Sequence, residues 1–285
     1  MTYDVPHPRD RAQSWASCDE DIRRYVGEAL AATGLQPSGV YVHGSLAMGC
    51  FYRAKSDVDV LVVVPEALTP GERERTARVL AERSRTRPML GDLEVSVLTE
   101  RQAAAGRHEF EVHYSAYWTE KALNGEYAGP GTDPDLAAHV TVVRARGVAI
   151  SGPAPTEVFA EVPREEYLAA IEADLDDVDL TEEPYYGVLN ACRVLMVRES
   201  GVVVSKEEGG EWGIAHLPEE HRPVVEQALQ CYRSARVVSA DERGTDGHGW
   251  DVEALAAFRR YLQPAVVDGD ASGLGAGPGA GLADR

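Results

Sequence analysis

Two aspartates separated by one residue stand at the start of the most strongly β-forming run of the sequence. Asp57 and Asp59 lie in the run from Ser56 to Val64, which is otherwise rich in valine. Side chains two residues apart in a strand point to the same face, so the two carboxylates are expected side by side. A hard divalent cation such as Mg²⁺ most simply relieves their repulsion. The alternative is a solvated edge strand, because an isolated Asp-X-Asp triplet is a weak signal.

A glycine and a serine upstream strengthen the metal interpretation. Gly44 and Ser45 follow a short segment, Val40 to His43, that is predicted as a strand. Glycine permits a tight turn and a close approach of the backbone, so Ser45 and nearby N–H groups can meet a phosphate. The strand, the turn and the paired aspartates together predict a platform for a phosphate and a metal ion.

A third carboxylate, Glu94, interrupts the apolar pattern of the next predicted strand, Leu93 to Leu98. Exposure to solvent is the simple explanation. A neighbouring strand is also where a general base for an acceptor hydroxyl should stand. We therefore predict Glu94 as a catalytic base, and Asp57, Asp59 and Glu94 as the catalytic carboxylates and ligands of Mg²⁺.

The segments around these residues alternate between helix and strand as far as Thr99. Helices are predicted from about Asp19 to Gly34 and from Pro70 to Arg85. After Thr99 the β signal fades and the periodic segments look helical. These helices are predicted at about residues 134–148, 164–178, 184–199, 218–235 and 252–262.

The order of these elements predicts a mixed-sheet domain followed by an all-helical one. The boundary is placed at residues 152 and 153, giving a catalytic domain over 1–152 and a helical domain over 153–267. Proline and glycine there are equally compatible with a turn inside one domain. The Gly/Ala-rich tail, 268–285, is predicted to be disordered.

Composition narrows the class of protein. The 285 residues are 44% hydrophobic, enough for a real core, and carry a formal net charge of -19. No run is long enough to span a membrane and the N-terminus lacks a signal peptide, so we expect a cytoplasmic protein without membrane partners. The negative charge opposes nucleic acid as a partner and favours a small cation, although solubility explains it equally well. The cysteines and histidines lack metal-ligand spacing, so His43, His113, His139 and His216 are predicted to be structural or surface residues.

The motifs together resemble a known family. The pairs Gly44-Ser45 and Asp57/Asp59, with Glu94, resemble the nucleotidyltransferase superfamily and specifically the streptomycin/spectinomycin adenylyltransferases. The resemblance implies an α+β fold, with an N-terminal nucleotidyltransferase-type mixed β-sheet domain with flanking helices and a C-terminal all-helical bundle domain. The likeness runs from Tyr41 to Tyr232. Its more specific motifs are Asp133 to Leu136, Ala149 to Pro153, Asn190 to Arg193, Ser205-Lys206, Glu211-Trp212 and Leu217-Pro218.

The resemblance also implies roles for individual residues. Ser45 and Ser56 are expected to bind the triphosphate of ATP, with Gly44 in the turn, while Asp57 and Asp59 hold Mg²⁺. The C-terminal part is expected to add Arg193 and Lys206 as triphosphate contacts and Tyr232 as a nucleotide contact. Two cations reaching a triphosphate make electrostatic sense in so acidic a chain. Ser205 and Glu208 also fit a capping box, which places Lys206 in the first turn of a helix.

The acceptor is less well defined by the sequence. The family's acidic contact to a drug ammonium group aligns best with Glu183, beside Glu182, in an acidic stretch from Glu172 to Glu183. The family's Gly-Glu-Trp segment is replaced here by Glu109 to Trp118, from which Tyr114 is the candidate aromatic contact. The loop between Ser45 and Ser56 is also one residue longer than in well-known members.

These observations predict a Mg²⁺-dependent enzyme that transfers AMP from ATP to a hydroxyl of a small cationic acceptor, most simply an aminoglycoside or aminocyclitol antibiotic, as a monomer. An alternative from another class is a nucleotidyltransferase-like regulatory protein, either a toxin–antitoxin partner or a nucleotide sensor. A third keeps the enzyme and replaces the drug with a metabolite.

Overall fold

The computed structural model describes residues 11–127, 129–176, 178–234 and 236–267. The tail at 268–285, predicted to be disordered, lies outside the described residues. Among the helices of the described part, none is long and apolar enough to cross a membrane.

A five-stranded sheet forms the centre of the N-terminal part. The strand order is β5-β3-β2-β1-β7, with β2 and β3 parallel and the other neighbours antiparallel. A second, two-stranded sheet pairs β4 with β6. The strands are β1 (Gly39–Val42), β2 (Val58–Val64), β3 (Leu93–Thr99), β4 (Glu109–Phe110), β5 (Val112–Tyr114), β6 (Gly131–Thr132) and β7 (Val148–Ser151).

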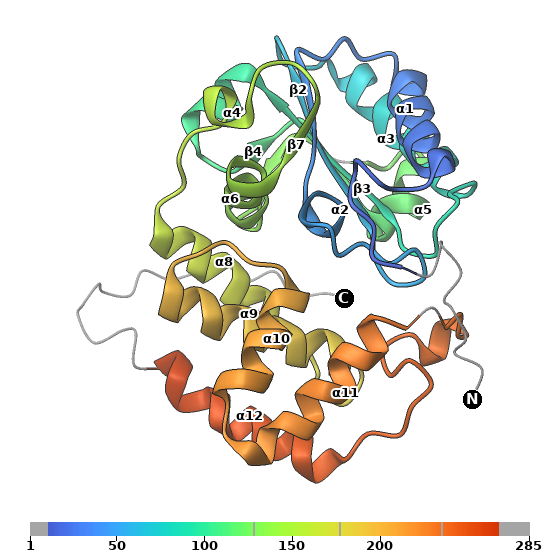
Figure 1. Ribbon diagram of the computed structural model, residues 1–285. Helices are drawn as coiled ribbons and strands as arrows, with labels where there is room; N and C mark the ends of the chain where they lie inside the picture. Colours follow the sequence, from blue (N-terminus) through green and yellow to red (C-terminus); the bar gives the residue numbers. More distant parts are fainter. Residues whose placement is uncertain (1–10, 128, 177, 235, 268–285) are drawn as a thin grey trace.

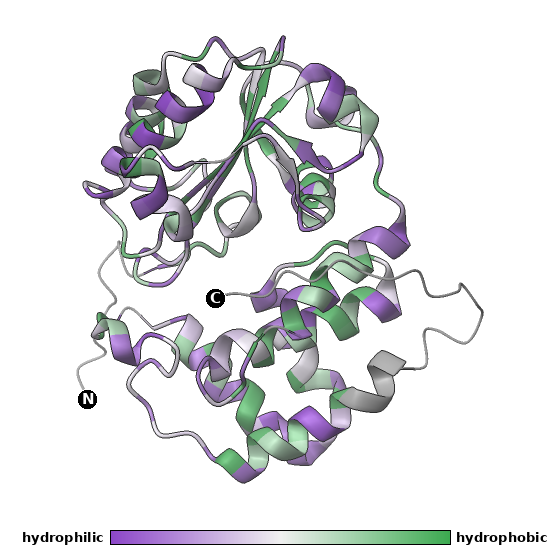
Figure 2. Ribbon diagram, turned by 180° about the vertical axis from the view of Figure 1, so that it is seen from behind, coloured by the Kyte–Doolittle hydropathy of each residue, from purple (hydrophilic) through white to green (hydrophobic). Residues whose placement is uncertain are grey.

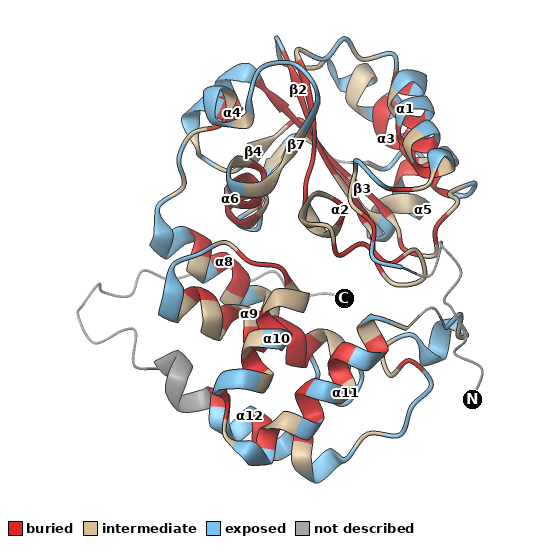
Figure 3. Ribbon diagram, viewed as in Figure 1, coloured by how far each residue is buried: buried red, intermediate tan, exposed pale blue. Residues whose placement is uncertain are grey.

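Helices cover both faces of the main sheet (Figure 1). On one face, α1 (Glu20–Thr33) and α3 (Pro70–Ser84) pack on the even-numbered residues of β2, such as Val60 and Val62. On the other, α6 (Leu136–Arg146) packs on Leu61 and Val63. Because both faces are covered, the central strands are buried almost throughout (Figure 3).

Among the described residues, all regular secondary structure after β7 is helical. Figure 1 shows these helices gathered below the sheet, in what we call the helical half. Its main members are α8 (Arg164–Asp176), α9 (Pro184–Ser200), α10 (Lys206–His216), α11 (Arg222–Tyr232) and α12 (Val252–Val267). The shorter elements of the chain are α2 (Gly44–Met48), α4 (Glu100–Ala105), η2 (Ala116–Trp118), α5 (Thr119–Leu123), α7 (Pro155–Val158), η3 (Glu219–His221) and η4 (Ala240–Glu242).

Close packing of α9 and α10 is a feature of the helical half. A Cβ on Gly209 would lie 2.5 Å from the backbone N of Arg193, so glycine allows the two helices to approach. The inward faces are apolar, with Leu189, Val225 and Phe258 fully buried, as the hydropathy colouring in Figure 2 shows for the helices as a group. The first turn of α10 is thereby fixed next to α9.

One helix belongs to the cores of both halves. α6 packs on the sheet through Leu136 and Val140, and on α8 and α9 through Ala137 and Ala138. Since these residues alternate around a single helix, α6 fixes where the helical half sits below the sheet.

The mixed α/β fold is confirmed, with two differences in detail. The prediction that β structure ends at Thr99 is wrong, because β4 to β7 follow it. These strands have two to four residues, too few to show a period, and most of β7 is exposed. Gly44-Ser45 opens the short helix α2 instead of a simple turn. The division into two domains at residue 152 stays a prediction; that position directly follows β7.

Candidate active site

A cavity of about 380 Å³ lies between the sheet and the helical half. Residues predicted from the sequence line it from both sides. From the sheet half these are Gly44, Ser45, Ser56, Asp57, Asp59 and Glu94, and from the helical half Arg193, Lys206 and Tyr232. The structure thus brings together all nine residues predicted for the carboxylates and the nucleotide.

Strand register places two of the carboxylates side by side. Asp59 and Glu94 are partners across the parallel pair β2 and β3. They are also the only residues of these two strands that are not buried. Asp57, directly before β2, has the same parity as Asp59. All three therefore belong to the face of the sheet that α6 covers.

Burial and mutual repulsion raise the pKa values of these three carboxyl groups. Burial and the neighbouring Asp57 raise the pKa of Asp59 to about 6. Burial, then the charges of Asp59 and Asp57, raise the pKa of Glu94 to about 8. Burial also raises the pKa of Asp57, whose Oδ1 accepts the backbone N–H of Asp92 at 2.5 Å. The unfavourable clustering of three carboxylates is the property expected of a site for a cation.

The donor set fits Mg²⁺. Carboxylate oxygens are the ligands that this hard cation prefers, and Asp57, Asp59 and Glu94 present them on one cavity wall. Their spacing is wider than that of a compact ligand group. Within the described residues, only Cys231, Asp246 and His248 bring three donor atoms within 4.8 Å of one another.

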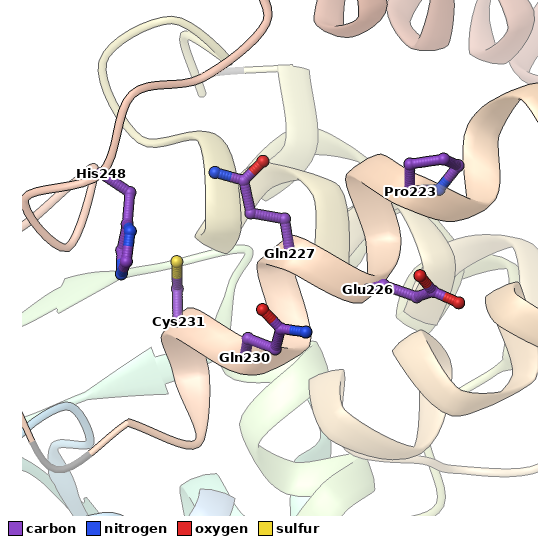
Figure 4. Close-up of a pocket in the computed structure, with 6 residues that line it drawn as sticks. All are labelled: Pro223, Glu226, Gln227, Gln230, Cys231 and His248. Carbon is purple, nitrogen blue, oxygen red and sulfur yellow. The ribbon is translucent and has the colours of Figure 1, made fainter.

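That compact group is a poor metal site. His248 lies with Cys231 at one end of a second pocket, of about 290 Å³, on the outer side of α11 (Figure 4). Asp246 accepts a charged hydrogen bond from Lys55, and Arg236 lies 2.8 Å from Nε2 of His248. Because Lys55 and Arg236 already bond two of the three would-be ligands, Asp246 and His248, we assign no metal there.

Gly44 sits against Asp59 in a way that excludes a side chain. Its φ is +58°, and a Cβ would lie 1.9 Å from Oδ2 of Asp59. The next residue, Ser45, has a buried Oγ that has no hydrogen-bond partner among the described residues. A buried hydroxyl of this kind beside the carboxylates fits a ligand oxygen, as predicted for a phosphate.

Lys206 and Arg193 reach the cavity from adjacent helices. The predicted capping box is confirmed: Ser205 caps α10 together with Glu208, so Lys206 occupies its first turn. Lys206 Nζ lies 3.8 Å from the centroid of the Tyr186 ring. Arg193 donates to Asp174 at 3.2 Å, while its buried Nε has no partner among the described residues. The two cations are fixed opposite the three carboxylates.

A charged pair from α6 was missed by the sequence analysis. His139 and Asp135 line the cavity, and their Nε2 and Oδ2 atoms lie 3.0 Å apart. Although burial lowers the pKa of His139, the hydrogen bond and charge of Asp135 and the charge of Glu94 raise it to about 9. His43 also lines the cavity, its ring centroid 4.9 Å from that of His139. The sequence analysis assigned both histidines to structural or surface roles and did not identify them as cavity residues.

The acidic stretch contributes a different residue from the one expected. Asp174 lines the cavity and accepts hydrogen bonds from Tyr186 and Asn190 at 3.0 and 2.9 Å. Glu182 and Glu183 are exposed and lie outside the cavity lining, so their contact with an acceptor stays a prediction. The exposure pattern could not be read from the sequence, because it depends on how the end of α8 and the segment before α9 face the cavity.

Tyr114 does not reach the cavity, so its assignment as an acceptor contact is corrected. Its side chain is fully buried, and its hydroxyl lies 3.0 Å from Oγ1 of Thr119. The register pairs it with Val95, whose side chain packs toward α1 and α3. Because cross-strand partners share a face, Tyr114 points away from the face that carries Glu94.

Comparison with known proteins bears on both halves. Residues 157–258 match the family model described as aminoglycoside adenylyltransferase, C-terminal domain. A spectinomycin 9-adenylyltransferase of Staphylococcus aureus is 29% identical over 206 residues, covering 68% of this chain and 77% of the relative. An aminoglycoside (3'') (9) adenylyltransferase of Klebsiella pneumoniae is 26% identical over 220 residues, covering 74% and 81%. These matches support the aminoglycoside adenylyltransferase family for this chain.

A solved structure shares the fold of this chain. The crystal structure of a spectinomycin adenyltransferase from Enterococcus faecalis, with ATP and spectinomycin, matches with a TM-score of 0.66 at 18% identity. The match covers 86% of this chain and 100% of that one. The predictions of the adenylyltransferase family and of an enzyme are confirmed, which favours catalysis over the regulatory alternative.

Replacing Gly44 by alanine tests its contact with Asp59. We expect Gly44→Ala to displace the carboxylate and to lower turnover by about 10²-fold, the usual effect of misplacing a catalytic group by about 1 Å. Gly34→Ala is the matched control, because Gly34 has a φ of +74° with nothing within 4 Å of an added Cβ. Both variants should lose about 1–2 kcal/mol of stability from the left-handed backbone, measured by denaturant unfolding. Equal turnover in the two variants would contradict the contact.

The raised carboxylate pKa values predict a pH dependence of stability in the absence of divalent cations. The folded protein binds protons more tightly than the unfolded chain, whose Glu94 and Asp59 have pKa values of 4.5 and 3.8, against about 8 and about 6 when folded. The free energy of unfolding should therefore fall as the pH rises from about 4 to 8. Urea unfolding at several pH values, with a chelator present, measures it. A Glu94→Gln variant should show a shallower decline, and an unchanged slope would contradict the assignment.

Proposed function

We propose that this protein transfers AMP from ATP to a hydroxyl group of an aminoglycoside or aminocyclitol and releases pyrophosphate. The observation that carries the proposal is the cavity, where Asp57, Asp59 and Glu94 face Arg193 and Lys206 from the other half. The relatives' names specify adenylyl transfer, and the structural neighbour holds ATP and spectinomycin.

Glu94 is the base in the proposed reaction. Its carboxylate takes the proton from the acceptor hydroxyl, and the oxygen attacks the α-phosphorus of ATP. A bond forms between that oxygen and phosphorus while the bond to the bridging oxygen of pyrophosphate breaks. Glu94 suits this role because it lies beside Asp59 across β2 and β3 and lines the same cavity.

The triphosphate is held by groups on both sides of the cavity. A Mg²⁺ ion bound by Asp57, Asp59 and Glu94 would polarise phosphoryl oxygens as a Lewis acid. Ser45 and Ser56 offer hydroxyls on the sheet side, with Tyr232 near Ser56. Arg193 and Lys206 offset the charge of the departing pyrophosphate. The positive end of α10 adds to the attraction at Lys206.

A cationic acceptor suits the remaining walls. Asp135 and Asp174 line the cavity, where their carboxylates, besides pairing with His139 and Arg193, would attract ammonium groups of an acceptor. Glu182 and Glu183 would extend this wall toward solvent. The net charge of -19 favours such an acceptor over nucleic acid. We further propose a monomer acting in the cytoplasm, with the nucleotide bound between a catalytic and a helical domain.

A pyrophosphate-release assay tests the function directly. The protein is incubated with ATP, Mg²⁺ and one acceptor at a time, chosen from spectinomycin, streptomycin and other aminoglycosides. We expect release that requires both a drug and a divalent cation, together with a drug product heavier by one AMP. Label from ATP appearing on the protein or on a protein partner, with no response to any drug, would favour the regulatory alternative.

The Glu94→Gln substitution tests the base. We expect kcat to fall by about 10²–10⁴-fold, since this is the usual contribution of general-base catalysis, while ATP affinity stays largely intact. Asp57→Asn is the comparison, because it should weaken Mg²⁺ binding as well. Steady-state kinetics and calorimetric ATP titration separate the two effects. Normal turnover by Glu94→Gln would show that another group takes the proton.

A further inference from the structure

The turn that carries Ser56 and Asp57 is held by side chains of the helical half. The Tyr232 hydroxyl donates to the carbonyl O of Cys50 at 2.9 Å. From the turn itself, the Tyr52 hydroxyl donates to Oε1 of Glu207 at 3.1 Å. Both contacts join the segment between α2 and β2 to the helices below it. They make this turn a point of attachment between the halves.

A buried ion pair reinforces the attachment. Lys55 Nζ donates to Oδ1 of Asp246 and, at 3.3 Å, to the carbonyl O of Arg236. The Lys55 side chain is 4% exposed and that of Asp246 is fully buried. Asp246 also accepts the Ser234 hydroxyl at 2.8 Å, so its carboxylate is well satisfied. Charges this deeply buried are strongly disfavoured unless they are paired.

The location of the pair points to a role beyond cohesion. Apolar side chains of similar size commonly hold two surfaces together as well as a buried ion pair does. An ion pair differs because it fixes direction and register. Lys55 lines the cavity and precedes Asp57 by two residues, so fixing Lys55 fixes Ser56 and Asp57 directly before β2.

We propose that Lys55 is a positioning residue whose ion pair with Asp246 fixes Ser56 and Asp57 for nucleotide binding. The nucleotide part rests on the proposed function. The positioning part concerns the turn itself and is measured without any ligand. Lys55 acts through its neighbours along the chain, and Asp246 acts from 191 residues away.

Hydrogen–deuterium exchange on the ligand-free protein is the first test. Lys55→Met removes the charge at similar length, and Asp246→Asn keeps the Ser234 bond and suits the left-handed φ of +54°. Each variant should exchange the amides of residues 52–57 about tenfold faster or more, with β2 and α9 unchanged. Unchanged exchange at 52–57 in both variants would overturn the proposal. Because two variants are used, failure of one to fold leaves the other decisive.

A double-mutant cycle in ATP affinity is the second test. With Mg²⁺ present, calorimetric titration should show each single variant binding ATP about tenfold more weakly, and the double variant no weaker than the worse single one. Lys55→Arg should restore most of the affinity. A loss confined to Lys55→Met, with Asp246→Asn normal, would make Lys55 a direct nucleotide ligand and overturn the positioning role. A lower melting temperature with normal ATP affinity would also overturn it.

A control variant tests whether any ion pair in the helical half has this effect. Arg198 pairs with Glu172 at 2.7 Å, with side chains 21% and 23% exposed, away from the cavity. Arg198→Met should leave both exchange at 52–57 and ATP affinity unchanged. Failure of the wild-type protein to modify any drug would overturn the proposed function and leave the exchange result standing. Normal exchange and normal ATP binding in the Lys55 and Asp246 variants would overturn the positioning role and leave the proposed function standing.

Discussion

The concentration of negative charge on one wall of the cavity between the two halves is the constraint on which the rest of this structure depends. Parallel register makes Asp59 and Glu94 neighbours, and strand alternation adds Asp57 to the same face. The chain cannot relax this arrangement without moving β2 or β3 out of the core. The negative charge is instead reduced by bound protons and offset by cations from outside the sheet. These cations are His139 and, on the opposite side of the cavity, Arg193 and Lys206. Because the ionised carboxylates repel one another, a cation bound between them would relieve this repulsion and be bound more tightly.

The helical half places positive charge opposite the three carboxylates. The chain is strongly acidic, yet the two cations opposite the carboxylates, Arg193 and Lys206, come from helices whose separation is set by Gly209. Moving α10 away from α9 by the width of one side chain would separate these two groups from each other. Packing in the helical half is therefore a condition for the electrostatics of the cavity. Since α6 joins that half to the sheet, it links the position of the cations to that of the carboxylates.

The site was predictable where local periodicity decides it. Asp57, Asp59 and Glu94 follow from a period of two along two strands, and Ser205 with Glu208 follows from a capping pattern. His139 and Asp135 could not be found in this way, because their nearness to Glu94 depends on how α6 crosses the sheet. Tyr114 shows the opposite error: its strand was not recognised, so the parity that turns it into the core was not available. The resemblance supplied Arg193 and Tyr232, for which no local pattern exists.

The segment between Ser45 and Ser56 combines two roles that are usually separate. It connects the end of α2 to the start of β2 along the cavity wall, and it receives Tyr232, Glu207 and Asp246 from the helical half. A segment with only the first role could be short and tolerant of substitution away from Ser45 and Ser56. Because it has both, a change at Tyr52 or Lys55 alters the relation between the halves and the placement of Asp57 at once. The length of this loop is thus coupled to the geometry of the wall that carries Asp57.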